Sequence, residues 1–195
     1  MYRDVGRLEF ALGHNGNLVN TEALADAAGM LPGTVTSDSD LIAELLAHEL
    51  GGHEATPDDG VEAPLVAALN AVLPELEGAF SLVLADAEHI IGVRDPNGFR
   101  PLCLGRLDRG WVLASESPAL DIVGAHFVRE LDPGEMVVID ASGPRSVRPF
   151  PLDRIEPRLC LFEFVYFARP DAQLYGRSVH QARIHMPSSR GRIAP

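Results

Sequence analysis

Apolar positions recur at helical spacing in the first part of the chain. Three segments carry a capping residue or apolar residues three and four positions apart, which is typical of short amphipathic helices. These segments are residues 21–29, 37–46 and 61–76. Asn20 is placed to cap the first segment, and Ser37 with Asp40 forms a capping box for the second. Pro74 is expected to end or bend the third.

From Gly78 onward the apolar runs shorten to the length of strands, and residues that favour turns separate them. The runs are 80–84, 90–93, 101–104, 111–114 and 136–139, and a run at 159–167 is expected to form a last strand. The segment 141–158 is rich in proline and arginine and is expected to be a connecting loop. Strands that follow one another without helices between them pair antiparallel. The fold class we expect is therefore α+β, with layered antiparallel sheets and helices.

The pair Asn15-Gly16 lies between apolar flanks in residues 8–20, an arrangement typical of a tight β-hairpin. We expect a strand, a turn at this pair and a short second strand. A glycine in such a turn can direct its backbone N–H into a cavity, and the asparagine side-chain amide is a second donor. Donors of this kind stabilise the oxyanion that forms during amide hydrolysis. On these residues alone, a purely structural hairpin is the alternative.

The composition of the chain limits the classes of molecule that it is expected to bind and the cellular compartment in which it is expected to occur. The chain has 195 residues, of which 46% are hydrophobic, so it can form a substantial core. Its net charge of −12 disfavours nucleic acid and anionic membrane surfaces as partners. No run approaches the roughly 20 apolar residues of a membrane helix, and no signal-peptide pattern follows Met1. Since the chain has only two cysteines, Cys103 and Cys160, we expect it to be cytoplasmic.

Several segments resemble the class II glutamine amidotransferases, which are N-terminal-nucleophile hydrolases. They are residues 13–20, 36–40, 78–82, 94–102 and 115–117. The segment 160–171 is similar to one family within this class, the amidophosphoribosyltransferases, and the resemblance extends from residue 10 to about residue 186. It implies an N-terminal-nucleophile hydrolase-like fold. It also implies a glycosyltransferase that uses ammonia from glutamine to form phosphoribosylamine from phosphoribosyl pyrophosphate in purine biosynthesis.

The resemblance also assigns roles to individual residues. Asn15 and Gly16 match the oxyanion donors, and Asp38 matches the aspartate that binds the α-amino group of glutamine. A carboxylate is a natural partner for an ammonium group, whereas without the family Asp38 would be interpreted as an acid at a helix start. The charged residues within 94–100 are given a structural role, because they suit a turn stiffened by ion pairs.

Cofactors and partners follow from the same resemblance. Cys160 matches an iron–sulfur ligand of some family members, but such a cluster takes four thiolates, and a buried core thiol is the alternative. We expect no cofactor in this chain, while the family implies magnesium in the transferase domain. Glutamine is the expected ligand, and a chain carrying the phosphoribosyltransferase part is a candidate partner. Full-length members are homo-oligomers.

The two ends of the chain depart from the family pattern. The family nucleophile is an N-terminal cysteine whose own α-amino group is the general base, whereas this chain starts at Met1 and its cysteines are internal. We therefore expect the chain alone to be inactive. Residues 1–170 are expected to form a partial amidotransferase domain without its first strands. Residues 171–195 form an arginine-bearing tail, expected to be the start of a missing transferase domain or the product of an altered reading frame.

Three alternatives stay open. Another class II amidotransferase, such as a glucosamine-phosphate or asparagine synthetase, shares the Asn-Gly segment, but residues 160–171 argue against it. A non-catalytic protein would retain the glutamine pocket as a binding or interaction site. A gene product that folds poorly would follow if missing strands left sheet edges exposed.

Overall fold

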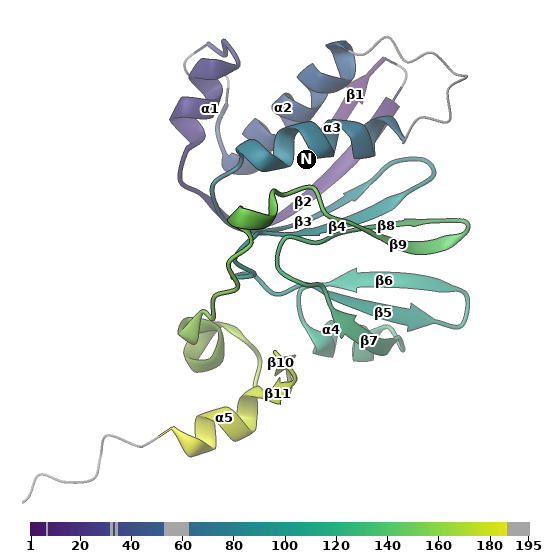
Figure 1. Cartoon of the computed structure of the whole chain (residues 1–195). Helices are drawn as coiled ribbons and strands as arrows, with labels where there is room; N and C mark the ends of the chain where they lie inside the picture. The colour runs from purple at the N-terminus through teal and green to yellow at the C-terminus, as the bar shows by residue number, and fades with distance from the viewer. Residues whose placement is uncertain (7, 32, 34, 53–62, 187–195) are drawn as a thin grey trace, which may run out of the picture. The chain divides into compact units, whose positions relative to one another are not determined.

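The computed structural model describes residues 1–6, 8–31, 33, 35–52 and 63–186, which form two compact units (Figure 1). The first unit is built from Met1–Leu102 and Leu131–Arg158, and the second from Cys103–Glu130 and Leu159–Pro195, as far as these residues are described. Each unit is therefore assembled from two separate stretches of chain. The domain boundary expected after residue 170 stays a prediction.

An antiparallel sheet of six strands forms the centre of the first unit. Its strands, in spatial order, are β1 (Tyr2–Val5), β2 (Leu8–Leu18), β3 (Gly78–Ala85), β4 (Ile90–Arg94), β8 (Met136–Asp140) and β9 (Gly143–Val147). The helices that follow β2 along the chain are α1 (Thr21–Ala27), α2 (Asp38–Gly52) and α3 (Pro64–Val72). Helices α2 and α3 lie over one face of this sheet (Figure 1).

Apolar side chains between the sheet and these helices form the core of the first unit. Side chains on a strand alternate between its faces, so Phe10, Leu12 and Leu18 of β2 all point into this core. The helices contribute their buried stripes, namely Ile42 and Leu46 from α2 and Leu65, Val66, Leu69 and Val72 from α3. The layered α+β class expected from the sequence is confirmed. Val61, the first residue of the predicted third stripe, lies outside the described residues.

The second unit contains a three-stranded antiparallel sheet and short helices. In spatial order its strands are β6 (Gly110–Ala114), β5 (Cys103–Leu107) and β7 (His126–Glu130). Its other elements are α4 (Ser117–Ile122), the paired strands β10 (Gln173–Leu174) and β11 (Arg177–Ser178), and α5 (Val179–His185). Part of the predicted tail packs within this unit, in a small apolar cluster of Phe164, Ala168, Ala172, Leu174 and Val179.

The hairpin expected at Asn15-Gly16 is wrong. Both residues lie inside β2, which continues to Leu18 and pairs with β3 along its second half, with Asn15 opposite Ser81 and Gly16 opposite Phe80. The hairpin prediction expected the residues after Gly16 to pair with the strand before Asn15. In the structure they pair with β3, which is distant in the sequence. Local turn preference cannot compete with a full antiparallel ladder to β3.

Two further predictions are corrected. The expected loop at 141–158 contains β9, an outer strand of the sheet, where proline and polar residues are tolerated. Residues 161–167 of the expected strand at 159–167 form instead a helical segment that ends in a π-helical turn (Glu163–Phe167), in which the N–H of Ala168 bonds to the carbonyl of Glu163. An apolar run of that length does not distinguish a strand from a helix.

The predicted helix starts are met in part. The Ser37 hydroxyl accepts a bond from the N–H of Asp40 at 3.2 Å, as a capping residue does, but the Asp40 carboxylate accepts the N–H of Thr36 in place of the Ser37 N–H that a capping box requires. Asn20 precedes α1, but its side chain makes no capping bond to this helix. It binds the carbonyl of Glu75 and the N–H of Glu77 instead. Asn20 thereby connects the start of α1 to the segment that leads into β3.

Candidate functional site

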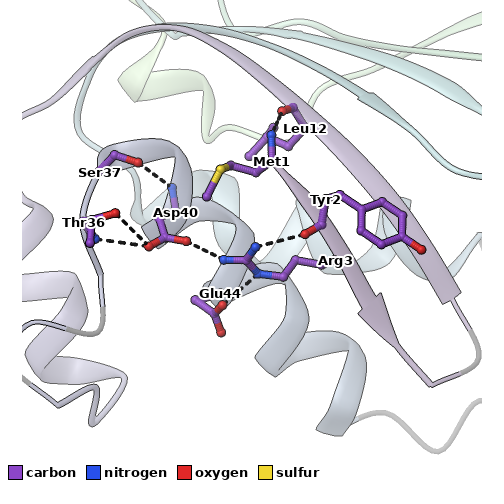
Figure 2. Close-up of polar contacts among 8 residues, drawn as sticks. All are labelled: Met1, Tyr2, Arg3, Leu12, Thr36, Ser37, Asp40 and Glu44. Atoms are coloured by element: carbon purple, nitrogen blue, oxygen red, sulfur yellow. Dashed lines mark hydrogen bonds and ion pairs between the residues drawn. The ribbon is translucent and has the colours of Figure 1, made fainter.

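The edge of β2 that faces away from β3 carries the backbone groups of the candidate site. Leu12 exchanges two hydrogen bonds with Met1 across this edge, at 2.7 and 2.8 Å (Figure 2). Because hydrogen-bonding directions repeat every second residue in a strand, the N–H groups of His14, Gly16 and Leu18 face the same edge. On the other side of Gly16, its partner Phe80 uses its own N–H and carbonyl for Asp95. The Gly16 N–H therefore points away from β3.

Gly16 allows β2 and β3 to approach closely. Its φ is +156°, and a β-carbon at this position would overlap the carbonyl oxygen of Ala79. Gly78 makes the reciprocal approach, since a β-carbon there would overlap the carbonyl oxygen of Asn17. A close contact between strands, rather than a tight turn, is thus the reason for glycine at position 16.

Asp38 lies on the same edge of β2. It is half-buried in the first turn of α2, and its Oδ2 accepts a hydrogen bond from the N–H of Leu18 at 2.7 Å. Leu18 and Gly16 are separated by about 7 Å along a strand. In the part of the chain that the structure describes, Asp38 Oδ1 and the side-chain amide of Asn15 have no hydrogen-bond partner. Gly16 and Asp38 therefore lie at the same edge of β2, while the exposed side chain of Asn15 lies on the opposite face of the strand from His14.

His14 is a polar residue of this region that could not be assigned a role from the sequence. It shares the helix-covered face of β2 with Leu12 and Leu18, and its Nδ1 lies 3.2 Å from the Ser39 hydroxyl. Among the described residues its buried Nε2 has no hydrogen-bond partner. Burial lowers the pKa of His14, nearby Asp38 opposes this effect and Arg100 reinforces it. These contacts favour a neutral imidazole between the strand and the start of α2.

The charged turn at 94–100 is organised around backbone groups. Asp95 is fully buried, and its carboxylate accepts bonds from the N–H groups of Phe80, Asn97, Phe99 and Arg100. Arg94 is also buried and donates to the carbonyls of Gly98, Arg100 and Leu131. Burial raises the pKa of Asp95, while the four N–H donors act in the opposite direction. This turn is fixed by bonds from side chains to the backbone, and it closes one end of β3 and β4.

The two cysteines do not fit an iron–sulfur cluster on their own. Both belong to the second unit, where Cys103 is buried with its Sγ bonded to the Ala114 carbonyl and Cys160 is half-buried. A cluster needs four thiolates, and the chain has two cysteines. Within the described residues, no cluster of three or more His, Cys, Asp or Glu is arranged to hold a metal ion.

Among the helices that the structure describes, none has the length and apolar character that a membrane-spanning helix needs.

Comparison with known proteins gives concordant matches. Residues 2–122 match a family described as glutamine amidotransferase domain. The amidophosphoribosyltransferase of Mycobacterium tuberculosis is 49% identical over 192 residues, which cover 95% of this chain and 34% of that protein. The amidophosphoribosyltransferase of Synechocystis is 40% identical over 191 residues, covering 95% and 36% respectively. The chain thus spans about a third of the length of these relatives.

A solved structure matches as well. The glutamine phosphoribosylpyrophosphate amidotransferase from B. subtilis, complexed with ADP and GMP, superposes with a TM-score of 0.78 at 34% identity. The match covers 93% of this chain and 37% of that one. Both units of the present chain therefore have counterparts within one part of a larger protein.

Proposed function

This chain belongs to the family of glutamine amidotransferase domains, and we propose that it is the glutaminase part of an amidophosphoribosyltransferase. The proposal is supported by relatives of that name, which match almost the whole chain. The complete enzyme would transfer ammonia from glutamine to phosphoribosyl pyrophosphate in purine biosynthesis. The transferase half of that reaction would come from a phosphoribosyltransferase part, of which residues 171–195 would form at most the start.

One observation carries the proposal: the Gly16 N–H and the Asp38 carboxylate lie on the same edge of β2. In the proposed complex, the free oxygen of Asp38 accepts a charge-assisted bond from the α-ammonium group of glutamine. The substrate then extends along the strand edge, and its side-chain carbonyl reaches the Gly16 N–H and the Asn15 amide. Two residues of β2 match the length of an extended glutamine side chain.

These two donors would act when charge develops on the substrate oxygen. Attack on the amide carbon breaks the carbonyl π bond and places a negative charge on that oxygen. Hydrogen-bond donors already aimed at this position stabilise the charge without having to reorganise. The role we propose for Asn15 and Gly16 is therefore stabilisation of the oxyanion, and the role of Asp38 is recognition of the amino group.

The nucleophile is a separate requirement. Cys103 and Cys160 are internal residues of the second unit, so neither combines a thiol with a free α-amino group. For the polypeptide with the printed sequence, we therefore propose glutamine binding without glutamine hydrolysis. The same property would define a non-catalytic glutamine-binding protein, which is the second candidate function.

Calorimetric titration with glutamine, paired with an assay for released ammonia, tests both statements. We expect the polypeptide with this sequence to bind glutamine saturably and the Asp38→Asn variant to bind it more weakly. Neither protein should release ammonia. Asp26→Asn is a matched control, because Asp26 is exposed on α1. Absence of glutamine binding would contradict the proposed site. Ammonia release by the purified polypeptide would contradict the proposed lack of turnover.

A further inference from the structure

Three consecutive residues at the start of α2 each contact a strand of the first unit. The contacts are Asp38 with the N–H of Leu18 at 2.7 Å, Ser39 with His14 at 3.2 Å, and Asp40 with Arg3 at 2.5 Å. The first two connect α2 to β2. The third, which Figure 2 shows, connects it to β1. The Asp38 carboxylate therefore belongs to a helix start that is held from two strands.

Asp40 is a buried carboxylate at the centre of one of these contacts. It accepts bonds from the N–H and the hydroxyl of Thr36, at 3.1 and 3.4 Å, as well as from Arg3 (Figure 2). The Thr36 N–H and then the Arg3 guanidinium lower the pKa of Asp40, although burial acts in the opposite direction. An ionised Asp40 thus joins the residues just before α2 to a cation on β1.

Arg3 contacts more than one turn of the helix. Its Nε donates to Glu44 at 2.8 Å, its Nη2 to Asp40, and its Nη1 to the carbonyl of Tyr2 at 3.0 Å. Asp40 and Glu44 are four residues apart, so they lie one turn apart on the same side of α2. A planar guanidinium that binds two carboxylates in this way limits rotation of the helix about its axis. Any such rotation would also move Asp38, two residues before Asp40.

We propose that Arg3 is a positioning residue for the glutamine site. Through Asp40 it fixes the first turn of α2, so that Asp38 keeps one oxygen on the Leu18 N–H and presents the other at the edge of β2. Arg3 does not touch the substrate in this proposal. The part that concerns glutamine rests on the proposed function, whereas the positioning of Asp38 can be measured without any ligand.

Amide hydrogen exchange at Leu18 measures that positioning directly. We expect Arg3→Met and Asp40→Asn each to speed exchange of the Leu18 amide by about tenfold, because the bond to Asp38 is weakened. The amide of Leu82, which lies in the β3–β4 ladder, should keep its protection. Glu22→Gln is the control, since Glu22 is exposed on α1 and takes no part in the contacts of Arg3. Unchanged exchange at Leu18, or equal acceleration at Leu18 and Leu82, would overturn the proposal.

A second arm measures recognition of the amino group. Glutaramate has the side-chain amide and the carboxylate of glutamine but lacks its α-amino group. We expect Arg3→Met to weaken glutamine binding and to leave glutaramate binding unchanged. In an Asp38→Asn background, the same substitution should have no further effect on glutamine binding.

The outcomes separate the two proposals. If the parent chain binds no glutamine, the proposed function fails, and Arg3 then has no role in substrate binding. The exchange rate of the Leu18 amide still decides whether Arg3 positions Asp38. If glutamine binds and Asp38→Asn weakens it, but Arg3→Met does not, the inference alone is overturned. Equal losses for glutamine and glutaramate would also overturn it, because a general structural role would affect both ligands.

Discussion

Gly16 has almost no room on the side of its α-carbon where a side chain would lie. The neighbouring backbone of Ala79 and Phe80 occupies that space, so the strands β2 and β3 can pair here only if residue 16 is glycine. The same residue directs its N–H toward the opposite edge, where the candidate oxyanion site lies. At the scale of one residue, a packing requirement and a proposed chemical role therefore coincide.

Gly16→Ala tests this requirement. The added methyl group would force β2 and β3 apart, and we expect a loss of about 1–3 kcal/mol in the free energy of unfolding. Gly13→Ala is the matched control on the same strand, because a β-carbon there would make an ordinary contact with the Val83 carbonyl at 3.7 Å. Urea denaturation of both variants gives the comparison. Equal stability of the two variants would show that the close approach does not require glycine.

At the scale of elements, the junction between β2 and α2 organises the candidate site. The strand supplies the N–H groups of Gly16 and Leu18, and the helix supplies Asp38. His14 lies between these elements and contacts Ser39 from the strand side. The site therefore depends on how a strand and a helix are joined, which no single segment determines.

Protonation of His14 should weaken this junction. Because burial lowers the pKa of His14, the unfolded chain binds this proton more readily than the folded one. The contribution to stability is thus present above the unfolded value of about 6.5 and is lost as the pH falls through the folded value.

His14→Gln should accordingly flatten the fall in stability between about pH 7 and pH 5. His48→Gln is the control, since His48 is exposed on α2. Urea denaturation at several pH values gives the slope for each protein. If His14→Gln keeps the slope of the parent chain, the buried imidazole does not contribute to acid sensitivity.

The elements differ in how far the sequence could predict them. The first three helices and the strands β3, β4, β6 and β8 follow from apolar spacing and capping residues. All of these elements except α1 and β6 bury apolar side chains, whereas α1 and β6 contain no buried residue. The strands β1, β7 and β9 have no regular apolar stripe; β1 and β9 are the outer strands of their sheet, where polar residues are common. The continuous path of β2 through Asn15-Gly16 depends on pairing with a strand more than 60 residues away.

On the scale of the whole molecule, two units are built from one chain, and this chain spans about a third of the length of its relatives. The roles expected for Asn15, Gly16 and Asp38 came from resemblance and stay predictions, and the structure adds that the Gly16 N–H and Asp38 share one edge of β2. His14 and Arg3 could not be assigned from the sequence, because their partners Ser39 and Asp40 are 25 and 37 residues away. Such contacts exist only once the sheet and α2 have assembled.

Glutamine titration followed by amide chemical shifts tests the central claim, that this strand edge is a glutamine site. We predict saturable shifts at the amides of Gly16 and Leu18, with no comparable change at Gly110 in the second unit. Asp38→Asn should reduce the affinity measured from these shifts. Glutamine-dependent shifts confined to other parts of the chain, or no shifts at all, would contradict the account.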